Sequence, residues 1–142
     1  MLRVASGRVT PAREPLEIDR PDVVAEVHAA FLAYEVALVD HDLAVLDDAF
    51  WDDPRVVRYG TADAQRGPRD IAQWRRKTGP GPRDRVLRDT QITAFGDDLA
   101  TVWTHFTDAI GGVGRQSQVW MRVDGAWRIV AAHVSRVDDE SA

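Results

Sequence analysis

Apolar residues recur at helical spacing over the first third of the chain. From residue 23 onward they fall three or four positions apart, the pattern of one buried helix face: Val23, Val27, Ala30, Phe31, Tyr34 and Leu38. Asp22, just after Pro21, is suited to cap the start of this helix. The pattern resumes after Asp40 as a shorter helical segment and stops before Pro54, which disfavours helix in the residue ahead of it. The sequence therefore predicts a bent pair of helices.

The rest of the chain alternates β-prone runs with turn residues. A short run at 56–59 is closed by a glycine and returns at 64–67, which predicts a hairpin. Pro68 suits the first turn of a short helix over 69–78, which a Gly- and Pro-rich stretch ends. Four longer β-prone runs follow, at 85–95, 99–110, 114–123 and 126–137. This order predicts an antiparallel meander curled around the helices, which is an α+β fold.

The length of 142 residues suits one domain. We expect this domain to span 21–137. Residues 1–20 show no consistent period and carry several Gly and Pro, so a mobile leader is predicted there. Residues 138–142 are expected to form a short tail.

Composition narrows the possible functions. The chain has no cysteine, which excludes disulfides and zinc–thiolate sites, and its net charge of −5 argues against a general affinity for nucleic acid. We find no signal-peptide pattern and no apolar run near the roughly 20 residues of a membrane helix, so a cytoplasmic protein without membrane contact is expected. The aspartate pairs lack calcium-loop or HExxH spacing, so no metal is expected.

Five strings along the chain carry a family resemblance. They are FLAYEVAL at 31–38, FWDDPRVVRYG at 50–60, ITAFGDDLA at 92–100, GRQSQVWMRV at 114–123 and WRIVAAHVS at 127–135. With the order of elements, they resemble the AtzH-like branch of the nuclear transport factor 2-like (SnoaL-like) superfamily. The resemblance implies a cone-shaped α+β fold, with helices packed in the concave face of a strongly curved antiparallel sheet. It also implies a homodimer formed through the outer face of the sheet and a pocket at the open end.

The resemblance implies a chemistry as well. The family is associated with cyanuric acid and oxalurate catabolism, which implies decarboxylation of 1,3-dicarboxyurea to allophanate without a cofactor. The tyrosine and arginine of the family fall on Tyr34 and Arg58. A small anionic substrate and a neighbouring amidohydrolase are the expected partners.

Both residues also have a purely structural interpretation. Tyr34 lies on the apolar helix stripe, so its buried phenol needs a partner and is either bonded to a backbone carbonyl or a general acid at the pocket floor. Arg58 interrupts an apolar strand, where a guanidinium without an anion is costly. It forms a salt bridge to Asp52, Asp53 or Glu35, or it binds a substrate carboxylate in bidentate fashion.

Strand alternation assigns further candidates to the two faces of the sheet. Arg115 and Ser117 share a face with two apolar residues, so we expect both to point into the cone near its mouth, as substrate-binding or rim residues. The opposite face is then the expected dimer interface, and it carries Gln116, Gln118 and Trp120.

His133 is expected to point inward, because alternation places it with Ile129. It is either a satisfied core histidine or part of a polar cluster with Ser135 and Arg58. Trp74 is a further candidate for substrate binding.

Three functions remain open from the sequence. The first is a cofactor-independent carboxy-lyase for an N-carboxylated urea, with Arg58 holding a carboxylate and Tyr34 supplying a proton. The second is a non-catalytic ligand-binding or accessory protein for a partner amidohydrolase. The third is a structural dimerisation module, in which the polar residues of the pocket pair among themselves.

Overall fold

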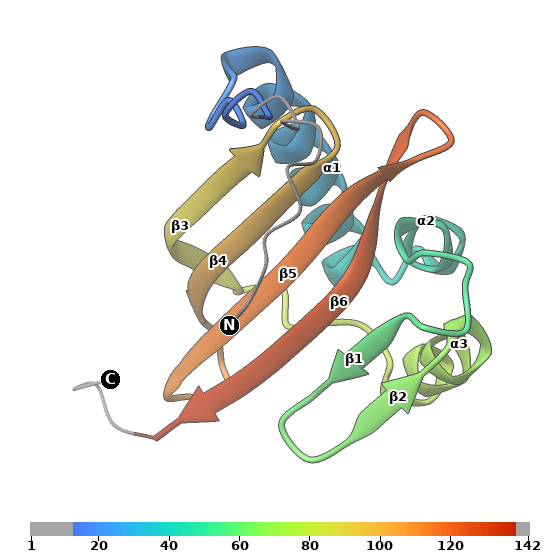
Figure 1. Ribbon diagram of the computed structural model, residues 1–142. Coiled ribbons are helices and arrows are strands. Elements are labelled where there is room, and N and C mark those ends of the chain that lie inside the picture. Colours follow the sequence, from blue (N-terminus) through green and yellow to red (C-terminus); the bar gives the residue numbers. More distant parts are fainter. Residues whose placement is uncertain (1–12, 139–142) are drawn as a thin grey trace, which may run out of the picture.

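Three helices pack against one face of a six-stranded sheet (Figure 1). The computed structural model describes residues 13–138. The helices are α1 (Pro21–Asp40), α2 (Leu43–Ala49) and α3 (Pro68–Thr78), which confirms the predicted order. Arg20 occupies the cap position of α1, so Asp22 lies in the first turn and does not cap the helix as expected. None of the described helices is long and apolar enough to span a membrane.

The sheet has the strand order β2-β1-β6-β5-β4-β3. Its strands are β1 (Val57–Tyr59), β2 (Ala64–Arg66), β3 (Val86–Phe95), β4 (Leu99–Thr107), β5 (Val113–Val123) and β6 (Ala126–Val137). The predicted hairpin and antiparallel meander are both present, and the α+β class is confirmed. The hairpin joins the meander through parallel pairing of β1 with β6, which places Arg58 opposite Ala132.

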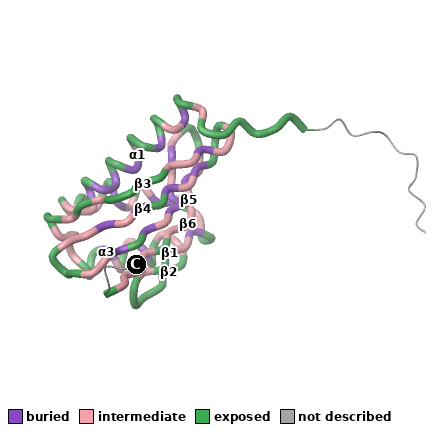
Figure 2. The backbone as a smooth tube through the Cα atoms, turned by 90° about the vertical axis from the view of Figure 1, so that its left-hand side faces the viewer, coloured by how far each residue is buried: buried purple, intermediate pink, exposed green. Residues whose placement is uncertain are grey.

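The core fills the space between the helices and the inner face of the sheet. Its largest fully buried side chains include Phe31, Leu46, Val102, Phe106, Trp120 and Ile129. Along α1, buried positions alternate with exposed ones, as Figure 2 shows. Burying a side chain of this size contributes about 1.5–3 kcal/mol, so the apolar stripe of α1 is a main source of stability.

The segment before α1 is attached to the edge strand β3. Ile18 forms a bridge with Phe95, and the backbone N–H of Asp19 donates to the Ala94 carbonyl at 2.9 Å. The Asp19 carboxylate in turn accepts from the Ala94 N–H at 2.9 Å. The ordered domain therefore begins before residue 21, because backbone pairing holds a segment that has no apolar period. The leader predicted at residues 1–12 and the tail at 139–142 lie outside the described residues.

The inner face of β5 carries Gln116, Gln118 and Trp120, which corrects their assignment to the outer face. Trp120 is 1% exposed and Gln118 is 2% exposed. The amides are buried because they are paired: Trp120 Nε1 donates to Gln118 Oε1 at 2.9 Å, and Gln116 Nε2 donates to Glu35 Oε1 at 2.8 Å. Arg115 and Ser117 therefore lie on the outer face, contrary to the prediction.

A β-bulge in β6 explains why His133 also lies on the outer face. Trp120 pairs with Ile129 while the preceding Val119 pairs with Ala131, so Val130 is an extra residue in β6. One extra residue reverses the alternation of side chains beyond it. Ile129 is fully buried, whereas His133 is exposed. The inward prediction for His133 was wrong because it assumed unbroken alternation.

Gly114 on β5 makes room for a core ring. A Cβ atom at this position would lie 2.1 Å from Cζ of Phe106, which is 1% exposed. The ring of Phe106 therefore packs directly on the backbone of β5, and a side chain at position 114 would displace it.

We expect Gly114→Ala to lower the free energy of unfolding by about 1–3 kcal/mol, the usual cost of overpacking. Urea unfolding measures this loss. The combined variant Gly114→Ala with Phe106→Leu should lose less than the sum of the two single variants, because the smaller side chain relieves the contact. Strictly additive losses would show that the ring is not what position 114 accommodates.

Candidate functional site

A cavity of about 310 Å³ lies between α1, α3, the β1–β2 hairpin and the inner face of the sheet. The glycine- and proline-rich loop after α3 closes one side of it. Its charged and aromatic lining includes Tyr34, Arg58, Asp63, Trp74, Arg75, Arg85, Phe106 and Arg136. Four of these lining residues are arginines, and three of the four form ion pairs with carboxylates of the protein.

Arg58 is held in the cavity by its position in the middle of β1. The residue is 8% exposed, and its guanidinium stacks on the ring of Trp74, with Cζ 3.5 Å from the ring centroid. Nη1 donates to Gln65 Oε1 at 2.8 Å and to Asp63 Oδ1 at 3.0 Å. Both hydrogen bonds use the same nitrogen, and within residues 13–138 Nε and Nη2 make no hydrogen bond, so they could donate to a ligand.

Asp63 is the carboxylate that pairs with Arg58. The sequence had suggested Asp52, Asp53 or Glu35 instead, but Asp53 pairs with Arg55 and Glu35 with Arg85. Asp63 comes from the turn of the β1–β2 hairpin, which returns it to the strand that carries Arg58. Its side chain is 40% exposed, so the ion pair lies at the mouth of the cavity.

Three donors surround the Asp63 carboxylate. Besides Arg58, Gln65 Nε2 donates to Oδ1 at 3.1 Å and Trp74 Nε1 donates to Oδ2 at 3.2 Å. Burial acts to raise the pKa of Asp63, but these hydrogen bonds and the charge of Arg58 outweigh it and hold the pKa below its ordinary value. Gly60 permits this cluster, because a Cβ there would lie 2.4 Å from Asp63 Oδ1.

Tyr34 lies deeper in the cavity, on the buried stripe of α1. It is 5% exposed, and its ring meets Phe50 edge to face at 6.0 Å. Arg75 Nη2 donates to the Tyr34 hydroxyl oxygen at 2.9 Å. Because a guanidinium has no acceptor, the phenol must accept this hydrogen bond, and its own proton can point elsewhere. The partner of Tyr34 is thus a side chain, not a backbone carbonyl.

Arg75 is, like Asp63, a site residue that the sequence analysis did not identify. It is 3% exposed, in the last turn of α3, next to the exposed Arg76. Its guanidinium lies 4.7 Å from the ring centroid of Trp74, so that ring contacts two arginines. The one available signal was helical spacing, since Ile71 and Arg75 stand four residues apart on the same face.

Two further ion pairs form the wall of the cavity. Arg85 Nε donates to Glu35 Oε2 at 2.9 Å, and both side chains are less than a tenth exposed. Arg136 Nη2 donates to Asp108 Oδ2 at 2.7 Å. The Arg85 guanidinium lies over the Phe106 ring, with Cζ 3.8 Å from the ring centroid. These arginines are satisfied within the protein and fix the shape of the cavity.

The guanidinium groups of Arg58 and Arg75 both contact the ring of Trp74, and within residues 13–138 only Arg58 of the two forms an ion pair, with Asp63. Burial lowers the pKa of the Arg58 guanidinium below its ordinary value, and the charge of Arg75 acts in the same direction, against Tyr34 and Asp63. An arginine still remains charged near neutral pH. A bound anion would relieve the repulsion between the two guanidinium groups.

Comparison with known proteins shows the family of this chain. The AtzH-like family model matches residues 16–140. The chain belongs to the AtzH-like family. This AtzH-like protein resembles a cystatin-like fold protein from Burkholderia xenovorans LB400, with 45% identity over 87% of this chain and 98% of that one and a TM-score of 0.84. A protein of unknown function from Pectobacterium atrosepticum SCRI1043 is 44% identical over 84% of this chain and 94% of that one, with a TM-score of 0.81.

More distant structures share the fold alone. A putative dehydratase of the NTF2-like family from Streptomyces avermitilis is 18% identical over 83% of this chain and 99% of that one, with a TM-score of 0.68. No curated protein matches the chain. The AtzH-like protein therefore has the predicted nuclear transport factor 2-like fold, with a cavity of a size suited to a small molecule.

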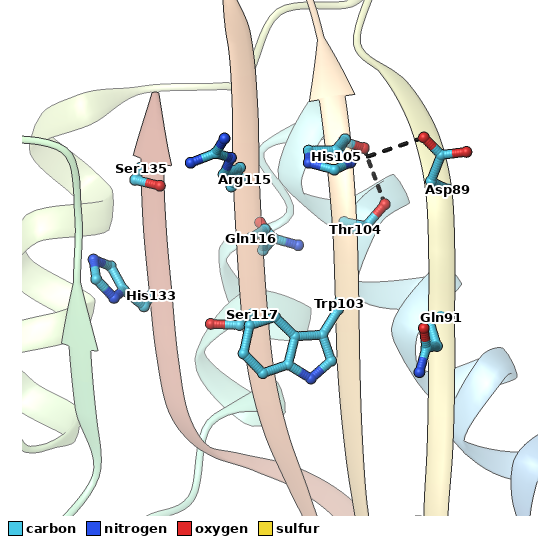
Figure 3. Close-up of a pocket in the computed structure, with 10 residues that line it drawn as sticks. All are labelled: Asp89, Gln91, Trp103, Thr104, His105, Arg115, Gln116, Ser117, His133 and Ser135. Atoms are coloured by element: carbon cyan, nitrogen blue, oxygen red, sulfur yellow. Dashed lines mark hydrogen bonds and ion pairs between the residues drawn. The ribbon is translucent and has the colours of Figure 1, made fainter. Parts of the chain in front are cut away.

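The other predicted ligand-binding residues do not join this pocket. Arg115, Ser117 and His133 line a separate hollow of about 360 Å³ on the outer face of the sheet, together with Trp103 and His105 (Figure 3). Trp74 does lie in the pocket with Tyr34 and Arg58. Within residues 13–138, no group of three or more His, Cys, Asp or Glu side chains could hold a metal ion.

We predict that Asp63→Asn lowers stability at neutral pH by about 1 kcal/mol, because the Asp63 side chain is 40% exposed and the amide oxygen of asparagine can still accept a hydrogen bond from the buried Arg58. The depressed pKa means that the stabilisation by Asp63 is present above about pH 4 and is lost as the pH falls through the lower folded-state pKa. The difference in unfolding free energy between wild type and variant should therefore shrink in acid. Asp124→Asn, at the β5–β6 turn, serves as the control. A difference that is the same at pH 3 and pH 7 would contradict the ion pair.

The homodimer stays a prediction. Gln116, Gln118 and Trp120 no longer support it, because they are buried inside the domain. Trp103 is 58% exposed on the outer face of the AtzH-like protein, where a large apolar ring favours an interface. We expect Trp103→Glu to sediment as a monomer at micromolar concentration and the wild type as a dimer. Val36→Glu, at a similarly exposed position on α1, should remain dimeric. A monomeric wild type would contradict the prediction.

Proposed function

We propose that this AtzH-like protein is a cofactor-independent decarboxylase for an N-carboxylated urea such as 1,3-dicarboxyurea. The observation that carries the proposal is that Arg58 and Tyr34, both buried, line the same cavity. Arg58 offers two unengaged nitrogens for a carboxylate, and Tyr34 has a hydroxyl proton that its hydrogen bond from Arg75 leaves available. An anion receptor beside a proton donor suits the release of carbon dioxide from a carbamate.

The reaction requires one proton and no electron transfer. The bond between the carbamate nitrogen and the carboxylate carbon breaks, its electron pair stays on nitrogen, and carbon dioxide leaves. Tyr34 delivers a proton to that nitrogen and regains one from solvent. The hydrogen bond from Arg75 stabilises the negative charge that develops on the phenol oxygen as the proton leaves. Arg58 meanwhile orients the substrate through a carboxylate.

A non-catalytic role as an anion-binding or accessory protein for an amidohydrolase is the second candidate. The pairing of Arg58 with Asp63 favours it, because an arginine that the protein already neutralises can release and rebind an anion without chemistry. Turnover separates the two functions, since a binding protein would not consume the substrate faster than its spontaneous decay.

We expect the wild type to accelerate decarboxylation of 1,3-dicarboxyurea generated in the assay, measured as carbon dioxide release. Tyr34→Phe should lower kcat by about 10²–10⁴-fold, the usual contribution of a general acid. Arg58→Lys should also lose most of its turnover, because lysine keeps the charge but not the bidentate fork. Both variants should still unfold cooperatively, with a lower melting temperature for Tyr34→Phe, because it removes the hydrogen-bond acceptor of the buried Arg75.

Tyr59→Phe and Arg66→Lys are the matched controls, because these residues contact each other on the hairpin and are both exposed. Their turnover should equal that of the wild type. Full activity in Tyr34→Phe would exclude the phenol as the acid. Wild-type protein that binds the substrate but leaves its decay rate unchanged would favour the accessory role.

A further inference from the structure

Arg75 differs from the other arginines of the pocket in having no countercharge. Among residues 13–138, Arg58 pairs with Asp63, Arg85 with Glu35 and Arg136 with Asp108, whereas no carboxylate forms an ion pair with Arg75. Its polar contact is the hydrogen bond to Tyr34, a neutral group, and it also lies near the ring of Trp74. A residue that is 3% exposed thus carries a charge that no described acidic side chain balances.

An uncompensated buried charge is costly, and a bound ligand could supply the missing counter-ion. A guanidinium near a second one is costlier still, and the charge of Arg75 already acts to lower the pKa of Arg58. The free pocket is therefore electrostatically incomplete, and an anion is the group that would complete it.

We propose that Arg75 is a specificity-determining residue that binds the second carboxylate of a dicarboxylate ligand, while Arg58 binds the first. This inference rests on the proposed function and assigns a role to a further residue of the same pocket. It makes the pocket selective for molecules with two carboxylates over those with one.

The geometry gives each guanidinium a separate edge for a carboxylate. Among residues 13–138, Arg58 donates hydrogen bonds through Nη1 alone, and Arg75 donates through Nη2 alone, to Tyr34. Trp74 contacts both groups, with its ring centroid 3.5 Å from Cζ of Arg58 and 4.7 Å from Cζ of Arg75. The ring thereby fixes the spacing of the two receptors. Tyr34 contacts Arg75, so the carboxylate bound there lies next to the proton donor.

Binding of two unreactive ligands tests the assignment without reference to turnover. Glutarate has as many atoms between its carboxylates as 1,3-dicarboxyurea, and glutaramate replaces one carboxylate by an amide of nearly the same shape. Titration calorimetry should show that the wild type prefers glutarate by about 10- to 100-fold, as expected for one charge-assisted contact.

Arg75→Met should abolish this preference while glutaramate binds within about threefold of the wild type. Arg76→Met is the matched control, because Arg76 is the next residue of α3, is exposed and pairs with Asp47 at 2.9 Å. It should keep the full preference. If Arg75→Met fails to fold, Arg75→Lys should still lose at least about threefold of the preference, since lysine lacks the fork.

A preference for glutarate that survives in the Arg75 variants overturns the inference, and so does a wild type without any preference. The two proposals fail separately. Intact turnover with an unchanged preference in Arg75→Met overturns this inference alone. An Arg75-dependent preference in a protein that does not accelerate decarboxylation overturns the proposed decarboxylase alone.

Discussion

Burial of guanidinium groups is the constraint on which this structure depends. A charge taken out of water must regain hydrogen bonds and a counter-ion, or it destabilises the fold. Glu35 and Asp108 meet that need for Arg85 and Arg136, and these pairs hold the far wall of the cavity. Arg58 is compensated at the mouth by a half-exposed carboxylate, and Arg75 is not compensated by any described residue.

The same constraint explains why polar side chains line the inner face of a sheet that also forms the core. Gln116 accepts a hydrogen bond from Arg85 and donates one to Glu35, so the amide completes an ion pair from α1 and the segment before β3. Toward the other end of β5, Trp120 and its neighbours pack as an apolar core. Strand β5 thus contributes both to the hydrophobic core and to the lining of the pocket. Only a few residues separate the polar part of its inner face from the apolar part.

Local signals in the sequence were sufficient to predict the elements of the fold. Proline at the start of α3, the spacing of apolar residues in α1 and the glycine-containing turns each act over a few residues, so the sequence displays them directly. Which side chains of the sheet point inward, in contrast, depends on partners that are far away in the sequence. Nothing near Gln116 indicates that Glu35 will bury it, and the extra residue Val130 reverses the alternation without any glycine or proline to mark the bulge.

The candidate site was predicted in part for the same reason. Tyr34, Arg58 and Trp74 stand out locally, as polar or aromatic residues in otherwise regular patterns, and the structure brings them together. Alternation of side chains assigned His133 and Arg115 to the inner face. For His133 the alternation is reversed by the bulge in β6. For Arg115 the inner face was assigned wrongly because the buried residues of β5 include the hydrogen-bonded amides Gln116 and Gln118. Arg75 was hidden in a basic run whose other members are exposed, and only its position against α1 makes it different.

Most of the charged residues of the pocket come from a different part of the chain than most of the main core. Arg58, Asp63, Trp74 and Arg75 all belong to the hairpin and helix α3, a continuous segment of residues 58–75 that packs at one end of the sheet. Tyr34 comes from α1, whose buried stripe is part of the main core. A substitution within the segment can change the number and spacing of cations without disturbing the meander.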